Sequence, residues 1–340
     1  MALRTVFPVV ALLLIAACSG DGRTPLVVYS PHGADLLRAV EQRYEQLHPT
    51  VDVQWVDMGS QEVLDRLRSE KANPQADVWF GAPAETFAQG AADGLLQPSA
   101  PSWAEQVREH SEPRGLYHGI YLTPEVIAYN TDAVSAAEAP KDWDAVLDPR
   151  WKDRVLIRDP LASGTMRTIF GMIIQRGLRA TGDTAAGFDW LRRLDAQTKE
   201  YVLNPTLLYQ KLARGEGVLT LWTMPDIELL KAKTGYPIDY VFPTSGTPLV
   251  VDAVGVVQGA PNAEGARAFV EFVGDVPAML LAAREFHRLP ARADLPEDSL
   301  PADLRRARQE LRPEPMDWEL LQQKGAEWMR YWDEHVRGRH

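Results

Sequence analysis

The residues best suited to binding chemistry lie in four turns, each placed where a strand-like segment ends and a helix-like segment begins. A helix N-terminus has backbone N–H groups without intrahelical partners and about half a positive charge from the helix dipole. Each turn is therefore a candidate anion-binding site. The side chains concerned are Ser30 and His32, Ser60, the run Ser163, Gly164 and Thr165, and Thr223 with Asp226.

The loop of Ser163, Gly164 and Thr165 is the strongest of these candidates, because a glycine lets a ligand approach the backbone closely and two hydroxyls flank it. Asp226 is expected on the other side of the same cleft, where it would pair with the amine of a zwitterionic solute. The candidate set also includes Gly81, which follows the strand-like residues 77–80.

The same hydroxyl residues also fit a structural role. Ser30, Ser60, Ser163 and Thr223 can each act as the N-cap of the helix that follows, where a cap contributes about 1 kcal/mol. Thr223 and Asp226 also have the spacing of a capping box. The sequence alone leaves both interpretations open for every turn.

Catalytic motifs are absent from the sequence. It contains no GxSxG elbow, no HExxH, no phosphate-binding P-loop and no complete dinucleotide fingerprint. The seven histidines are scattered, and with 47 acidic residues chance carboxylate pairs are common. The sequence therefore predicts a binding protein and not an enzyme, with no cofactor and no metal site.

The elements that position these turns alternate between strand-like and helix-like patterns. Such alternation predicts an α/β fold, and we expect two lobes, each a mostly parallel sheet flanked by helices. Ligands of open α/β sheets lie at the carboxyl ends of strands, so turns from two facing lobes would meet in one cleft. A hinge is expected near residues 121–124 and 244–251. The strand at residues 250–257 is expected to return to the first sheet. The predicted strands cover residues 26–29, 51–55, 77–80, 126–129, 154–157, 218–222, 238–242 and 250–257.

Length and charge support this organisation. The chain has 340 residues, enough for roughly two domains of about 150. Its net charge of −11 excludes a nucleic-acid partner, because phosphate backbones would be repelled. The expected domains are lobe I at residues 26–122 plus 248–295, lobe II at 123–247, and C-terminal helices at 296–340 that pack on the lobes.

The N-terminus has the pattern of a secretory signal peptide over residues 1–17. Arg4 precedes twelve uncharged, mostly apolar residues at 6–17, whereas a membrane-spanning helix needs about 20. Cys18 is the only cysteine, so the chain can form no internal disulfide. Residues 18–25 are mostly small or polar, which is typical of a flexible tether.

Several segments together resemble the family 1 extracellular solute-binding proteins of ABC importers, most of all the branch with ferric-iron and phosphonate binders. They are the lipobox-like residues 14–18, and residues 27–33, 76–80, 159–165 and 244–248. The resemblance implies a two-lobed fold similar to that of type II periplasmic-binding proteins. It also implies that the protein is a monomer and that a lipid on Cys18 anchors it at the periplasmic face of a membrane. It also implies delivery of a small anionic or zwitterionic solute, namely a phosphonate, phosphate ester or carboxylate, to an ABC permease.

Other functions remain open at this point. One alternative is a ferric-ion or metal-chelate binding protein that uses His32, Asp226 and a bound anion. The ferric branch uses adjacent tyrosines near positions 225 and 226, and none of the ten tyrosines here has a tyrosine neighbour. A ligand sensor and a secreted enzyme are the remaining alternatives.

Overall fold

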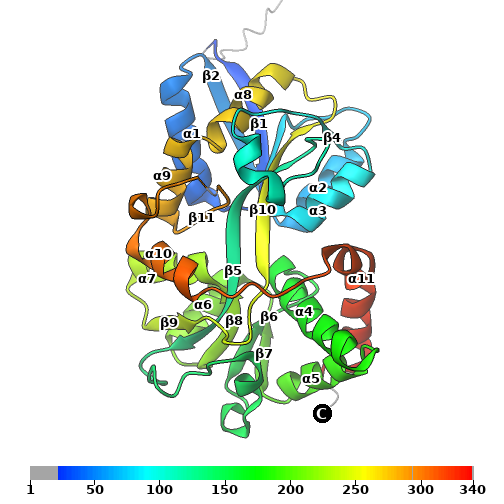
Figure 1. Cartoon of the computed structure of the whole chain (residues 1–340), viewed down its shortest axis with the longest axis vertical. Coiled ribbons are helices and arrows are strands. Elements are labelled where there is room, and N and C mark those ends of the chain that lie inside the picture. The colour runs from blue at the N-terminus through cyan, green and yellow to red at the C-terminus, as the bar shows by residue number, and fades with distance from the viewer. Residues whose placement is uncertain (1–21, 293, 339–340) are drawn as a thin grey trace, which may run out of the picture.

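The computed structural model describes residues 22–292 and 294–338, which form an α/β fold around a mixed sheet (Figure 1). The predicted signal peptide and the first half of the predicted tether, including Cys18, lie outside the described residues. The strands are β1 (Thr24–Ser30), β2 (Val51–Asp57), β3 (Val78–Pro83), β4 (Leu96–Gln97), β5 (His118–Asn130), β6 (Val155–Arg158), β7 (Thr198–Val202), β8 (Leu219–Thr223), β9 (Ile238–Val241), β10 (Leu249–Val257) and β11 (Leu289–Pro290).

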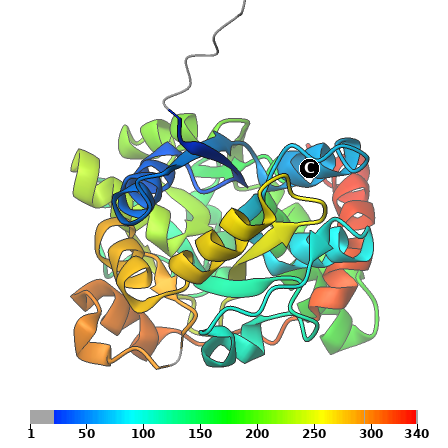
Figure 2. The same ribbon diagram turned by 90° about the horizontal axis from the view of Figure 1, so that it is seen from above.

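Helices surround the central strands, as Figure 2 shows from above. The α-helices are α1 (Ala34–Leu47), α2 (Ser60–Ser69), α3 (Ala84–Ala92), α4 (Gly164–Thr181), α5 (Ala185–Asp195), α6 (Pro205–Ala213), α7 (Met224–Thr234), α8 (Ala263–Val273), α9 (Val276–Phe286), α10 (Ala302–Glu310) and α11 (Trp318–His335). Short 3-10 helices cover Ala104–His110, Trp143–Leu147, Pro149–Trp151 and Glu297–Ser299.

The long strands β5 and β10 run antiparallel to each other and connect two lobes (Figure 1). In lobe I, β1 pairs in parallel with β2 and β3, and β10 joins β3 and β4 in antiparallel fashion. In lobe II, β6 pairs in parallel with β7 and β8, whereas β5 is antiparallel to β8 and β9. The sheet is thus mixed where a mostly parallel one was expected, because the chain crosses between the lobes and returns.

The predicted strands correspond to strands of the structure, and β10 returns to lobe I as expected. Strand β7 was not predicted. It lies at the edge of the sheet, and only Val202 of its residues is fully buried. An edge strand with one solvated side can hold charged residues such as Lys199 and Glu200, which obscure the hydrophobic pattern.

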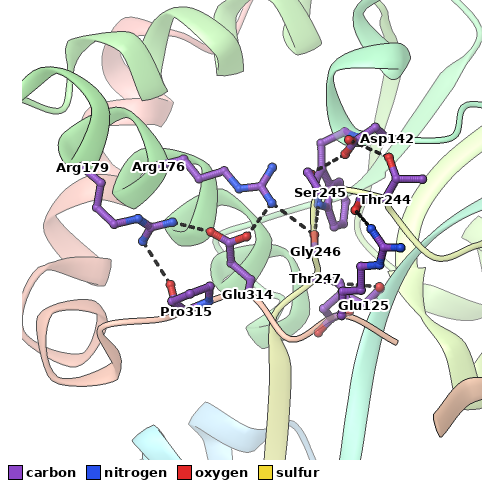
Figure 3. Close-up of polar contacts among 12 residues, drawn as sticks. Glu125, Asp142, Arg176, Arg179, Thr244, Ser245, Gly246, Thr247, Glu314 and Pro315 are labelled. Atoms are coloured by element: carbon purple, nitrogen blue, oxygen red, sulfur yellow. Dashed lines mark hydrogen bonds and ion pairs between the residues drawn. The ribbon is translucent and has the colours of Figure 1, made fainter. Parts of the chain in front are cut away.

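The C-terminal segment is attached to the connection between β9 and β10, close to the expected hinge (Figure 3). The Thr247 N–H donates to the Arg312 carbonyl at 2.9 Å, and the Glu314 N–H donates to the Thr247 carbonyl at 2.7 Å. The Glu314 carboxylate pairs with Arg176 at 2.6 Å and also with Arg179. The buried Thr247 hydroxyl donates to the backbone oxygen of Glu125 at 2.6 Å, so this segment helps to fix the position of Glu125 in β5.

Helices α10 and α11 complete the hydrophobic core of lobe II. Their buried side chains include Leu304, Trp328 and Trp332, which join the core formed by β5, β6, β8 and α4. Helix α11 also contacts α3 of lobe I, so it lies against both lobes.

Candidate functional site

A cleft of about 520 Å³ lies between the two lobes, beside the strands β5 and β10 that connect them. The N-terminal ends of several helices line it. Gly33 precedes α1, Ser60 begins α2, Gly164 begins α4, Pro205 begins α6 and Thr223 precedes α7. Their positive dipole ends favour a negatively charged group in the cleft.

Carboxyl side chains also line the cleft, and the sequence analysis did not expect so many. They belong to Asp57, Glu125, Asp226 and Asp252, and among the described lining residues Arg288 is the only lysine or arginine. The cleft therefore combines positive helix ends with acidic side chains. Such a site suits a ligand that carries both signs of charge.

Burial raises the pKa of three of these acids, namely Asp57, Glu125 and Asp252. Glu125 is fully buried, and burial together with nearby Asp226 and Asp252 holds the pKa of its carboxyl well above the usual value. Burial also raises the pKa of Asp252, although Arg288 and the Thr123 hydroxyl oppose that change. Burial therefore favours the neutral, protonated form of Glu125 in the free protein.

Asp226 is oriented by an aromatic pair. Its Oδ2 atom accepts hydrogen bonds from the Tyr209 hydroxyl at 3.2 Å and from Trp222 Nε1 at 3.0 Å. Arg288 lies 3.6 Å from its other oxygen. Asp226 is therefore held in place before any ligand arrives.

Several buried polar atoms of the cleft have no hydrogen-bond partner within the described residues. They are His32 Nε2, both carboxyl oxygens of Glu125, Thr223 Oγ1 and Arg288 Nε. More than about 90% of buried polar groups in native proteins are hydrogen-bonded, so the partners of these atoms must come from a ligand or from ordered water in the cleft. Burial and Arg288 also hold the pKa of His32 well below its usual value, so its imidazole is neutral.

The structure brings most of the candidate residues to this cleft. Its lining includes His32, Ser60, Gly164, Thr165, Thr223 and Asp226. Ser30, Gly81 and Ser163 are not among the lining residues. The Ser30 hydroxyl accepts from the His32 N–H at 3.2 Å, and a Cβ at Gly81 would lie 2.4 Å from His32 Nε2, so both positions shape the surroundings of His32.

The capping alternative is correct for one turn and wrong for the others. Ser163 is the N-cap of α4, and its hydroxyl accepts from the Met166 N–H at 3.3 Å. The N-caps of α1 and α2 are Gly33 and Gly59, so neither Ser30 nor Ser60 is a cap. Thr223 occupies the N-cap position of α7 without a side-chain cap bond, and the capping box with Asp226 does not form.

Four important lining residues were missed in the sequence: Glu125, Tyr209, Asp252 and Arg288. Two of them had a visible signal. Glu125 and Asp252 are acids within or beside apolar strand runs, and a charge in a buried strand indicates a functional position. Tyr209 and Arg288 have no such signal, because the fold alone brings them to the cleft.

Two further searches concern metals and membranes. Within residues 22–292 and 294–338, no group of three or more His, Cys, Asp or Glu side chains is arranged to hold a metal ion. In the same part of the chain, no helix has the length and hydrophobicity needed to cross a bilayer.

Comparison with known proteins connects this chain to solute transport. Over 99% of its length the chain is 28% identical to the probable ABC transporter periplasmic-binding protein y4fP of Sinorhizobium fredii, and covers 93% of it. Over 72% of the chain it is 28% identical to iron uptake protein A1 of Synechocystis, covering 70% of that protein. It is 24% identical, again over 72% of the chain, to a putative 2-aminoethylphosphonate-binding periplasmic protein of Salmonella typhimurium, covering 71% of it.

The fold matches solved structures of the same kind. The periplasmic binding protein AfuA of Actinobacillus pleuropneumoniae, solved with fructose-6-phosphate, superimposes with a TM-score of 0.80 at 23% identity over 94% of this chain and 100% of AfuA. Residues 74–323 match the bacterial extracellular solute-binding protein family. The chain therefore belongs to that family, and it is a periplasmic solute-binding protein of ABC importers rather than an enzyme.

Proposed function

We propose that this protein is a lipid-anchored receptor that binds a small anionic or zwitterionic solute, such as a phosphonate, phosphate ester or carboxylate, and delivers it to an ABC permease. The observation that carries the proposal is the cluster of unpaired buried polar atoms in a cleft surrounded by helix N-termini. Cys18 would carry the lipid, and the protein would act as a monomer at the periplasmic face of the membrane.

The proposal includes closure of the two lobes around the solute. Lobe I would comprise residues 26–122 and 248–295, lobe II residues 123–247, and the helices after residue 295 would pack on both. The hinge would lie where β5 and β10 pass between the lobes. The two strands pair with each other there, with Leu249 opposite Pro124. Closure around a ligand is a known hinge motion of such folds.

A thermal-shift screen followed by calorimetry tests the ligand class. The panel contains ethylphosphonate, 2-aminoethylphosphonate, glucose 6-phosphate, glycerol phosphate, citrate and ferric citrate. A true ligand at about 100 times its Kd adds about 2.7 kcal/mol to the free energy of unfolding. Failure of every phosphonate, phosphate ester and carboxylate to stabilise the protein would contradict the proposal.

A variant pair links binding to the cleft. Thr223→Val removes an unpaired hydroxyl at the start of α7 and is expected to weaken binding about 2- to 10-fold, the value of one neutral hydrogen bond. Thr234→Val makes the same change at the far end of α7, where the hydroxyl donates to the Leu230 carbonyl, and should leave affinity unchanged. Equal effects of both changes on affinity would argue against the cleft as the binding site.

The iron-uptake relative favours a second candidate, a ferric ion or ferric chelate held with His32 and Asp226. In the ferric citrate arm, we expect no iron–phenolate band in the visible spectrum, because burial and Asp226, to which the Tyr209 hydroxyl donates, hold the pKa of Tyr209 well above its usual value and disfavour a tyrosinate. A strong band that disappears in Tyr209→Phe would instead support ferric binding. A role as a sensor predicts that deletion of the gene leaves solute uptake intact.

A further inference from the structure

We propose that Glu125, Asp226 and Asp252 form a subsite for a positively charged amine, so that the transported solute is an amine that also carries an acidic group. This inference rests on the proposed function, because it takes the cleft to be the binding site. It adds that the floor of the cleft binds a positively charged group, and it names the side chains that bind this group.

The three carboxyl groups come from different elements that meet in the cleft. Glu125 belongs to β5 and lies opposite Thr223 of β8 in the strand register. Asp252 belongs to β10, is 8% exposed and accepts a single hydrogen bond from the Thr123 hydroxyl at 2.7 Å. Asp226 lies in the first turn of α7. All three line the same cavity, with two of them nearly or fully buried.

Glu125 is the most informative of the three. Its side chain is 0% exposed, and both carboxyl oxygens lack a hydrogen-bond partner within the described residues. A buried carboxyl without partners is costly unless the missing partner arrives with a ligand. The neighbouring Thr223 hydroxyl is also unpaired, so donors and acceptors are available at one point of the cleft floor.

The charge of the cleft favours an ammonium group over other donors. Arg288 is the only lysine or arginine among the described lining residues, and it already lies near Asp226 at 3.6 Å. A solute hydroxyl could hydrogen-bond to Glu125 but would leave the excess of carboxylates uncompensated. An ammonium group supplies three donors and one positive charge. A metal ion is disfavoured because these side chains are not grouped for coordination within the described residues.

Proton exchange gives this subsite a measurable signature. The charged groups that act on Glu125 are Asp226 from α7, Asp252 from β10 and Glu85 from α3, while Arg288 acts on Asp252. Burial and these carboxylates hold the pKa of Glu125 well above its usual value. When an ammonium group binds, Glu125 loses its proton to the solvent and the resulting carboxylate pairs with the ammonium. Binding of the amine is therefore accompanied by proton release from Glu125.

Calorimetry with matched solute pairs tests the inference. The pairs are 2-aminoethylphosphonate with ethylphosphonate, and glucosamine 6-phosphate with glucose 6-phosphate, which differ at the amine. We expect the amine to bind about 10- to 150-fold more tightly in at least one pair, the range for a charge-assisted hydrogen bond. Titrations in buffers of different ionisation enthalpy should show more proton release with the amine than with its partner, because only the amine draws the proton from Glu125.

Glu125→Gln separates the subsite from the rest of the cleft. This variant should weaken binding of the amine by more than it weakens binding of the amine-free partner, so that the preference for the amine and the additional proton release are lost. Asp252→Asn should also reduce the preference for the amine, and this variant replaces Glu125→Gln in the test if Glu125→Gln does not fold. The matched control is Glu228→Gln on α7, because Glu228 accepts from the Tyr240 hydroxyl and does not line the cleft.

The outcomes are distinguishable. If amine-free partners bind as tightly as the amines, or if Glu125→Gln keeps the preference, the amine subsite is wrong while the receptor function stands. If no member of either pair binds and no other anion of the screening panel does, the proposed function fails and this inference fails with it. If only amine-free anions of the panel bind, the inference alone is overturned.

Discussion

Replacing Glu85 by Gln should stabilise the protein at neutral and alkaline pH but not in acid. Glu85 lies in the first turn of α3 and lines a cavity with Trp318 and Gln322 of α11, where the two lobes meet. Burial is the largest influence and raises the pKa of its carboxyl from 4.5 to about 7. Asp252 adds to this effect, whereas the N–H of Glu85 itself and Arg167 oppose it.

The sign of the pH effect follows from the raised pKa. Below about pH 4.5 the acid is neutral in both the folded and the unfolded protein, so its burial costs no ionisation free energy. Between about 4.5 and 7 the unfolded chain ionises while the folded protein stays protonated, and the free energy of unfolding falls. Above about pH 7 the acid is ionised in both states, so the loss of unfolding free energy no longer changes with pH.

The size of the effect comes from the same two values. A shift from 4.5 to about 7 is about 2.5 units, which at 1.36 kcal/mol per unit sets an upper limit of about 3 kcal/mol. Because Glu85 is only partly buried as a whole residue, solvent screening lowers the expected difference to roughly 1–3 kcal/mol. Gln is nearly isosteric and stays neutral, so Glu85→Gln should recover this amount above pH 7.

Urea denaturation followed by tryptophan fluorescence, at intervals from pH 4.5 to 8.5, measures the difference between the variant and the unaltered protein. Taking the difference cancels the contributions of all other titrating groups. Glu264→Gln is the matched control, because Glu264 lies in the first turn of α8 but is exposed. If the Glu85→Gln curve runs parallel to that of the unaltered protein over this range, the reasoning about burial of Glu85 is refuted.

Three further predictions concern the anchor, the cap and the hinge. Cys18→Ser should release the protein from the membrane fraction or block its processing, and unchanged membrane retention would rule out a lipid at this position. Ser163→Ala should lower the free energy of unfolding by about 1 kcal/mol, because α4 loses its N-cap. Its affinity for the solute, measured by calorimetry, should stay within about twofold of that of the unaltered protein. A large loss of affinity would mean that the Ser163 hydroxyl contacts the ligand. Small-angle X-ray scattering should give a smaller radius of gyration with saturating ligand, and identical curves would argue against lobe closure.

Local sequence patterns were sufficient for the strands other than β4, β7 and β11, and for the turns at the ends of the predicted strands. The apolar run 250–257 predicted β10 and its return to lobe I, because a buried strand needs a continuous hydrophobic stretch. The turn of Ser163, Gly164 and Thr165 was likewise predicted, and it begins α4 at the cleft. The relative direction of neighbouring strands was not predicted correctly, because the hydrophobic pattern of a strand does not depend on whether its neighbours run parallel or antiparallel to it.

The sequence by itself determined the fold class, the family and the location of most turns that line the cleft, because each of these depends on residues close together in the chain. Only the tertiary structure decided which hydroxyl caps a helix and which faces the cleft, as Ser163 and Thr223 show. It also decided that Glu125 and Asp252 lie beside Asp226. Their proximity arises from the pairing of β5 with β8 and β10, which joins residues about 100 or more positions apart. The charge of a cleft is set by such long-range pairing, and local patterns do not contain it.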